Sequence, residues 1–307
     1  MSLDKMKGAL YGVAIGDALG APFEFQKATP KIKYTGILSD IDVSVRFQFA
    51  TMTILASSIT DDTEMTIQLL KGLIENNGIY DEDIIIKKYL EWANLKSTPL
   101  GKNTRALMKG VNTVKGFRKR QLKIDTTNVQ SNGSLMRCLP IAFLDNWKEA
   151  SDMDVSLTND NLVNKECSFL YLSMLRFLIF NEPMNIKCKE TEVKNAIKSA
   201  LDGDYSVDVS INKGWVVHAL YVSIITLFNT SSFDDGMDYI AKHFIKGDTD
   251  TIMAITGGLL GAFYGFEKLI NGEKSSINIE KLDNYFETTD RPKFTDELFD
   301  ELLTFIS

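Results

Sequence analysis

Apolar residues recur at helical spacing along most of this chain. Residues three and four apart share one face of a helix, and the spacing predicts helices near residues 3–18, 63–76, 82–93, 103–114, 135–145, 160–180, 191–201, 216–229, 233–244, 250–270 and 295–306. The stretch from Ser39 to Ile54 alternates β-branched and polar residues and could form a hairpin, but no further strands are available to pair with it. We therefore predict an all-α fold, a multi-helix orthogonal bundle with one irregular insert.

Two of the predicted helices carry a glycine at every fourth position. These glycines are Gly8, Gly12, Gly16 and Gly20 in the first helix and Gly257, Gly261 and Gly265 in a late one. Each glycine costs roughly 1 kcal/mol of helix propensity relative to alanine, so a compensating gain is needed. We expect the two glycine faces to pack directly against each other. The alternative is that one of the two stretches is a flexible loop.

Composition and charge add limits on domain number and partners. The 307 residues are 44% hydrophobic and contain no linker-like break, so we expect one domain over 1–307, with the residues after about 270 as a C-terminal helical extension. A net charge of −7 disfavours general binding to nucleic-acid backbones or anionic membranes. The three cysteines lack a CxxC spacing, and the N-terminus lacks an apolar signal region, so we predict a cytoplasmic location.

Acidic and hydroxyl residues gather where two of the predicted helices begin. The run Thr60-Asp61-Asp62-Thr63 precedes the helix near 63–76. A helix N-cap needs only one side-chain oxygen, so this run exceeds that need, although plain capping stays an open alternative. The run Gly247-Asp248-Thr249-Asp250-Thr251 repeats the same chemistry before the helix near 250–270.

Packing of these two helix starts against each other would create a strongly acidic site. The side chains brought together would be Thr60, Asp61, Asp62, Asp248, Asp250 and Thr251. Carboxylates so crowded require a cation. Carboxylate and hydroxyl oxygens suit Mg²⁺ or Mn²⁺, whereas His218 and His243 are too few for a histidine-rich zinc site. We therefore predict one divalent ion, or a pair of them, at these helix N-termini.

A third polar segment, Ser131-Asn132-Gly133-Ser134-Leu135-Met136-Arg137, precedes the predicted helix near 135–145. Its backbone N–H groups could receive an anion. A simple Asx or capping turn is the alternative. The chain contains no P-loop, dinucleotide-binding or nucleophile-elbow glycine motif, which disfavours those three classes of enzyme.

Taken together, these segments resemble the ADP-ribosylglycohydrolase family in their order along the chain. The matching pieces are residues 8–24, 60–63, 132–137 and 247–262. Each motif is weak alone, but four in this order are specific, and they leave the tail after about residue 270 uncovered. The resemblance implies an all-α domain with two Mg²⁺ or Mn²⁺ ions at the floor of an ADP-ribose cleft.

The resemblance also assigns roles to individual residues. It gives the metal ions to Thr60, Asp61, Asp62, Asp248, Asp250 and Thr251, and substrate binding to Glu24, Asn132, Gly133, Ser134 and Met136. Glu24 would lie near the distal ribose, and the 132–134 segment would meet the diphosphate. Ser131 stands where the family usually has glycine, and the segment Pro99-Leu100-Gly101 lacks the acidic residue of the arginine-directed members. Arginine specificity is therefore left open.

The resulting hypothesis is hydrolysis of the bond between the anomeric carbon of ADP-ribose and an acceptor, which is an ADP-ribosylated protein or a small ADP-ribosyl compound. The catalytic residues would be Glu24, Asp61 and Asp250: the two aspartates through the metal ions, and Glu24 by moving a proton or positioning the water. One alternative is an ADP-ribose-binding reader or crystallin-like protein without turnover. Another is a metal phosphohydrolase that cleaves the diphosphate.

Overall fold

The computed structural model describes residues 2–24, 33–47, 50–95 and 100–304. Helices form nearly all of the regular structure in these ranges, which confirms the all-α prediction. They are α1 (Ser2–Glu24), α2 (Asp61–Glu75), α3 (Glu82–Ala93), α4 (Lys102–Met108), α5 (Val114–Gln121), α6 (Trp147–Thr158), α7 (Leu162–Phe180), α8 (Thr191–Leu201), α9 (Val216–Asn229), α10 (Phe233–His243), α11 (Thr249–Tyr264), α12 (Phe266–Ile270), α13 (Ser275–Thr288) and α14 (Asp296–Leu303), with short 3₁₀ helices η1 (Asn132–Ser134) and η2 (Leu139–Phe143). Strands β1 (Val43–Phe47) and β2 (Ala50–Ile54) pair antiparallel as a hairpin between α1 and α2.

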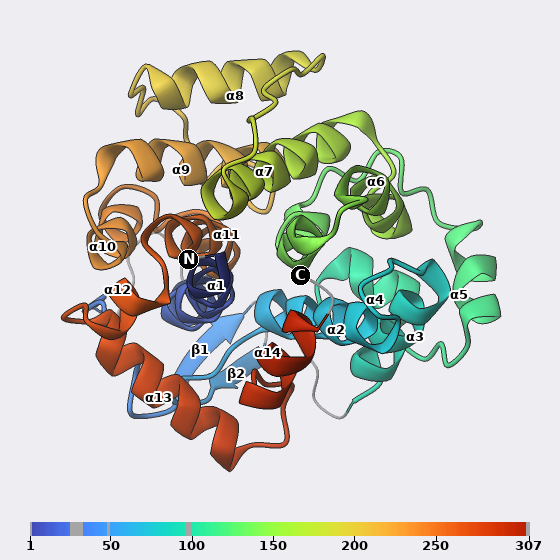
Figure 1. The fold of residues 1–307 in the computed structure, drawn as a ribbon, viewed down its shortest axis with the longest axis horizontal. Coiled ribbons are helices and arrows are strands. Elements are labelled where there is room, and N and C mark those ends of the chain that lie inside the picture. Colours follow the sequence, from blue (N-terminus) through green and yellow to red (C-terminus); the bar gives the residue numbers. More distant parts are fainter. Residues whose placement is uncertain (1, 25–32, 48–49, 96–99, 305–307) are drawn as a thin grey trace.

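The antiparallel helices α1 and α11 form the centre of the fold. In Figure 1 they lie together, with α7, α9 and α10 on one side and β1, β2 and α13 on the other. A Cβ atom added to Gly12 would overlap the backbone oxygen of Gly257, and one added to Gly8 would lie 2.5 Å from the backbone oxygen of Gly261. The two backbones are therefore in direct contact, as the glycine spacing predicts, and neither glycine face is a loop.

The predicted continuous helix over 250–270 is wrong, because α11 ends at Tyr264 and α12 begins at Phe266. Gly265 between them has a φ of +83°, a left-handed conformation that glycine adopts at low cost. The Asp4 carboxylate accepts a hydrogen bond from the Glu267 N–H at 2.7 Å and so helps to start α12. The third glycine of the late helix therefore marks a helix end, although its backbone still lies against α1: a Cβ atom added to Gly8 would be 2.8 Å from the Gly265 carbonyl carbon.

Other predicted boundaries also fail for local reasons. The expected helix near 135–145 is replaced by the 3₁₀ helix η2, which contains Pro140 with no N–H to donate. The expected helix over 103–114 stops at Met108, and α5 starts separately after Thr113, whose side chain caps it. Helix α6 lies outside the predicted helices, and α13 lies in the predicted C-terminal helical extension without predicted bounds of its own. In both helices several buried positions hold polar residues, such as Asp154 and Asn278, which hide the apolar period.

The C-terminal segment packs onto the rest of the chain. Phe294, Leu298 and Leu302 form an apolar stripe there, and all three side chains are buried. Figure 1 shows α13 and α14 beside the hairpin and α2. Within the described ranges, no helix has both the length and the apolar content needed to cross a bilayer. The cytoplasmic location stays a prediction.

Candidate functional site

The glycine contact between α1 and α11 brings the end of α1 to the start of α11. A Cβ atom added to Gly20 would lie 2.6 Å from the backbone nitrogen of Asp250. No other residue type would allow the two helices this close at that point. As a result Glu24, the last residue of α1, lies next to Asp248 and Asp250.

Asp17, fully buried on α1, holds the start of α2 at the same place. Its carboxylate accepts hydrogen bonds from the N–H of Thr60 at 2.9 Å and of Thr63 at 3.1 Å, and from their hydroxyls at 2.7 and 2.5 Å. The two N–H groups belong to a helix N-terminus and need acceptors. Asp17 is not among the predicted site residues, although the sequence carries a signal for it: it is the only charged residue between Gly8 and Phe23.

Carboxylates from three helices converge at this junction. Single carboxylate oxygens of Glu24, Asp248 and Asp250 all lie within 4.8 Å of one another, and the Glu24 and Asp250 side chains share a hydrogen bond. Asp61 and Asp62, in the first turn of α2, are close enough to raise the pKa of neighbouring acids in this group. The fold thus brings together the two acidic runs that the sequence analysis selected, and adds Glu24 to them.

Burial, and further the repulsion from neighbouring carboxylates, raises the pKa values of four of these carboxyls, those of Glu24, Asp61, Asp62 and Asp250. Burial, with the charges of Asp248 and Asp61, raises the pKa of Glu24 to about 9. Burial, with the charge of Asp17, raises the pKa of Asp61 to about 7, and burial raises those of Asp62 and Asp250 well above the usual range. Among the described residues, no lysine or arginine pairs with this cluster. It therefore needs either protons or cations to balance its charge.

The oxygen atoms of this cluster are better suited to bind divalent ions than to cap helices. Asp62 Oδ1 and Asp250 Oδ1 are buried and have no hydrogen-bond partner in the described part of the chain. Asp248 is the N-cap residue of α11, yet its side chain does not cap that helix. At the start of α2, Thr60 accepts only a long 3.5 Å hydrogen bond from the N–H of Asp62. Buried carboxylate oxygens without donors, with no nitrogen or sulfur ligand, are the environment that Mg²⁺ or Mn²⁺ prefers.

The predicted metal-binding hydroxyls lie in the same turns as the aspartates. Thr251 is buried in the first turn of α11, beside Asp250. Thr60, which is half-buried, has its hydroxyl 2.9 Å from Asp62 Oδ2 and 2.7 Å from Asp17 Oδ1. Thr60 therefore contacts Asp62, and Thr251 directly follows Asp250 in the chain.

The segment from Asn132 to Ser134 forms η1 and borders the acidic cluster. The Asn132 side chain donates a 2.8 Å hydrogen bond to Asp248 Oδ2, which ties η1 to the start of α11. The Asn132 N–H donates to the backbone oxygen of Gly214 at 2.8 Å. Gly214, which the sequence analysis also missed, has a φ of +78°, and a Cβ atom there would lie 3.0 Å from Asp248 Oδ2. No motif marks Gly214 in the sequence.

The predicted substrate-binding residues differ in accessibility. Gly133 is half-buried, with open space on the side where a Cβ atom would lie. Ser134 is fully buried, and its hydroxyl accepts a 2.9 Å hydrogen bond from the side chain of Asn164. Met136 is also buried, and its backbone oxygen accepts a 3.3 Å hydrogen bond from the Thr66 hydroxyl. Gly133, like Glu24, keeps part of its surface free to meet a ligand.

The fold places an acidic group beside the segment Leu100–Gly101, where the sequence has none. Asp61 Oδ2 accepts a 3.4 Å hydrogen bond from the N–H of Gly101. Residue 99 lies outside the described ranges. A carboxylate therefore borders this segment from α2, and not from the segment itself.

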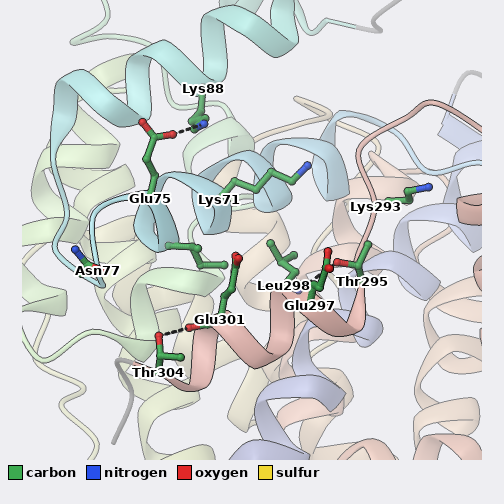
Figure 2. Close-up of a pocket in the computed structure, with 11 residues that line it drawn as sticks. Lys71, Glu75, Asn77, Lys88, Lys293, Thr295, Glu297, Leu298, Glu301 and Thr304 are labelled. Atoms are coloured by element: carbon green, nitrogen blue, oxygen red, sulfur yellow. Dashed lines mark hydrogen bonds and ion pairs between the residues drawn. The ribbon is translucent and has the colours of Figure 1, made fainter.

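A groove of about 690 Å³ lies away from the acidic cluster, between α2, α3 and α14 (Figure 2). Its charged lining is mixed, and Glu75 and Lys88 pair with each other across it. Lys71 and Glu75 follow Asp61 by 10 and 14 residues on α2, which is about 15 to 21 Å along a helix. The groove therefore contains none of the predicted site residues. It is lined by Lys71, Ile74, Glu75, Asn77, Lys88, Lys293, Thr295, Glu297, Leu298, Glu301 and Thr304.

Comparison with known proteins gives one consistent result. The family model for ADP-ribosylglycohydrolase matches residues 1–301, which extends over the tail that the motifs left uncovered. ADP-ribosyl-[dinitrogen reductase] glycohydrolase of Rhodospirillum rubrum is 25% identical over 290 residues, covering 90% of this chain and 91% of that protein. ADP-ribosylarginine hydrolase Tri1 of Pseudomonas putida (strain GB-1) is 27% identical over 326 residues, covering 97% and 81%.

A solved structure of an ADP-ribosylglycohydrolase-related protein complex shares the fold, with a TM-score of 0.69 at 18% identity over 99% of this chain and 98% of that one. The order of motifs, the central glycine contact and the acidic cluster agree with the match over nearly the whole sequence. The chain belongs to the ADP-ribosylglycohydrolase family.

Proposed function

We propose that this chain hydrolyses the glycosidic bond between the anomeric carbon of ADP-ribose and an acceptor, with the help of two divalent ions, Mg²⁺ or Mn²⁺. Water adds across the bond, so that the products are free ADP-ribose and the acceptor with a hydrogen on its leaving atom. The acceptor is a side chain of an ADP-ribosylated protein or the leaving group of a small ADP-ribosyl compound. The observation that carries the proposal is the buried carboxylate cluster, in which one oxygen each of Asp62 and Asp250 has no donor among the described residues, in a chain of this family.

The ion-binding residues of the proposal are Thr60, Asp61, Asp62, Asp248, Asp250 and Thr251. When bound, the ions supply counter-charge for the carboxylates and Lewis acidity for the reaction. The negative side chains favour the positive charge that develops on the ribose in an oxocarbenium-like transition state. Glu24 is the proton carrier, since its half-buried carboxyl lies at the edge of the cluster, beside Asp248 and Asp250.

An arginine-linked acceptor is the first to test. The relative in Pseudomonas putida is named for ADP-ribosylarginine, and Asp61 gives the Gly101 segment of this chain a neighbouring negative charge. A serine-linked peptide is the second acceptor to test. Its leaving group is an uncharged oxygen, which needs a proton but no neighbouring carboxylate to pair with. The 132–134 segment, with accessible Gly133, is proposed to meet the diphosphate.

The test is release of ADP-ribose from arginine-linked and serine-linked ADP-ribosyl peptides in Mg²⁺, Mn²⁺ or EDTA. We expect release with either ion and none in EDTA. Asp250→Asn removes a charged ligand, so Mg²⁺ affinity and turnover fall together, by more than the roughly 10- to 100-fold typical of losing an outer-shell partner. Asp152→Asn is the matched control, since Asp152 is exposed and its 3.1 Å ion pair with Lys165 contributes little.

The products distinguish this proposal from its alternatives. AMP and ribose phosphate would identify a phosphohydrolase. Metal-dependent binding of ADP-ribose without release from any acceptor would favour the reader or crystallin-like protein. Full activity of Asp250→Asn at limiting Mg²⁺ would contradict the metal assignment, and failure to bind ADP-ribose at all would contradict the proposed function.

A further inference from the structure

A buried arginine lies directly behind the accessible part of the 132–134 segment. The Arg137 side chain is fully buried, and its Nη1 donates a 2.8 Å hydrogen bond to the backbone oxygen of Gly133 and a 3.0 Å hydrogen bond to the Thr158 hydroxyl. Its Nε and Nη2 donate to the side chain and backbone of Asp154 at 2.9 and 2.8 Å. One rigid guanidinium thus joins η1 to α6 through four hydrogen bonds.

The charge of Arg137 is balanced inside the same network. Asp154 is also fully buried, and its Oδ1 accepts hydrogen bonds from the hydroxyls of Tyr80 at 3.3 Å and Tyr89 at 3.0 Å. The Tyr89 ring lies 5.2 Å from the guanidinium carbon. Burying an ion pair so completely is seldom the most stable choice, since apolar residues of the same volume often stabilise a protein more. The network therefore needs a reason besides stability.

The reason lies in what Arg137 fixes. A peptide group is planar, so holding the Gly133 carbonyl fixes the plane of the peptide that joins Gly133 to Ser134. Further hydrogen bonds of the segment join Asn132 to Gly214 and Asp248, and Ser134 to Asn164. Among the described residues, only the Arg137 side chain donates a hydrogen bond to the Gly133 carbonyl, so Arg137 holds this peptide where the other contacts of the segment do not reach.

We propose that Arg137 is a positioning residue for ADP-ribose: it sets the conformation of Gly133 against which the diphosphate binds, and Asp154, Tyr80 and Tyr89 hold Arg137 in place. This inference rests on the proposed function. Arg137 does not touch the ligand or the ions itself. Its effect therefore falls on affinity for ADP-ribose and on KM, and much less on Mg²⁺ affinity or kcat.

Arg137→Lys tests this with Arg176→Lys as the matched control. Lysine keeps the charge that Asp154 needs, but one ammonium cannot replace the fork that reaches Gly133, Thr158 and Asp154 together. Arg176 is a second buried arginine that donates to the backbone oxygens of Ala142 and Leu144, at 2.8 and 2.7 Å, and pairs with Glu182. Both substitutions remove hydrogen bonds from a buried guanidinium, but only Arg137 contacts Gly133.

The readouts are calorimetric titration of ADP-ribose at saturating Mg²⁺, titration of Mg²⁺, and KM and kcat for an ADP-ribosyl peptide. We expect Arg137→Lys to weaken ADP-ribose binding and raise KM by about tenfold, with Mg²⁺ affinity and kcat within about threefold of wild type. Arg176→Lys leaves all four quantities near the wild-type values. Tyr89→Phe, which removes one hydroxyl from Asp154, weakens ADP-ribose binding by a smaller factor in the same direction.

Unchanged ADP-ribose affinity in Arg137→Lys overturns the inference, as does an equal loss in Arg176→Lys, which would indicate general loosening of the fold. A loss of Mg²⁺ affinity as large as the loss of ADP-ribose affinity also overturns it. If Arg137→Lys does not fold, Tyr89→Phe decides, and wild-type affinity in that variant contradicts the inference. Failure of the wild-type chain to bind ADP-ribose contradicts the proposed function, whereas normal binding by Arg137→Lys contradicts this inference alone.

Discussion

In the absence of divalent ions, the stability of this protein is expected to fall as the pH rises above 7. Burial is the main cause that raises the pKa of Glu24 to about 9 and that of Asp61 to about 7. In the unfolded chain both carboxyls ionise near pH 4. The folded state therefore binds protons that the unfolded state has already lost, and this advantage of the folded state decreases as the pH rises through the folded pKa values.

The magnitude follows from the fraction of each carboxyl that stays protonated when folded. Between pH 7 and 8.5, Glu24 contributes a loss of about 1.9 kcal/mol and Asp61 about 0.4 kcal/mol, at 1.36 kcal/mol per proton and pH unit. For a chain of this length a loss of about 2 kcal/mol lowers Tm by roughly 4 °C. His218 and His243 do not disturb this window, since burial lowers their pKa values and both are neutral above pH 7.

The assay is thermal unfolding at pH 7 and 8.5, in EDTA and in saturating Mg²⁺. Bound cations favour the ionised carboxylates, so Mg²⁺ should raise Tm most at pH 8.5 and remove most of the pH dependence. Glu24→Gln removes the contribution of about 1.9 kcal/mol from Glu24, so the decrease of Tm in EDTA should be smaller than in the wild type, while the other buried carboxyls keep part of it. A Tm in EDTA that is constant or rises over this range would refute the reasoning, and so would a pH dependence that Mg²⁺ leaves unaltered.

Three further predictions concern the contacts that build the site. Gly257→Ala places a Cβ atom against the backbone oxygen of Gly12 and should lower the free energy of unfolding in urea by about 2 kcal/mol or more. In the control Gly72→Ala, the new Cβ atom meets mainly the end of the Ile85 side chain, so the free energy of unfolding should stay within about 1 kcal/mol of wild type. Equal losses in the two variants would contradict the close backbone contact. Asp17→Asn cannot accept hydrogen bonds from all four donors at the start of α2. We therefore expect the free energy of unfolding, measured with Mg²⁺ present, to fall by about 2 kcal/mol, and calorimetry to show weaker Mg²⁺ binding. Wild-type values of both quantities would refute the role of Asp17. Arg291→Gln leaves fully buried Glu64 without its ion pair and should lower the free energy of unfolding by about 3 kcal/mol; a loss under about 1 kcal/mol would show that Trp92, which donates to Glu64 at 2.7 Å, is sufficient.

The sequence alone determined the features that depend on local chemistry. Helical spacing predicted most of the helices, because apolar residues must recur every three to four positions to cover one helix face. The glycine spacing of α1 and α11 predicted their contact, since so many helix-destabilising residues require a packing gain. The acidic runs at Asp61–Asp62 and Asp248–Asp250 predicted a cation site, because carboxylates repel each other wherever the chain places them.

Only the tertiary structure decided which residues from distant segments meet. Asp17 accepts hydrogen bonds from the start of a helix 43 residues away in sequence, and Asn132 donates a hydrogen bond to Asp248, 116 residues away. Arg137 forms an ion pair with Asp154, which lies on a helix that the apolar spacing does not predict. None of these pairings has a local signature, because a buried polar group needs a partner of the right geometry and any segment can supply it. Gly265 illustrates the same limit. It follows Gly261 at the four-residue spacing of the other glycines, but a left-handed φ and the Asp4 carboxylate make it the end of a helix. Local patterns therefore fixed the elements and their chemistry, whereas the packing of helices against one another determined the geometry of the site.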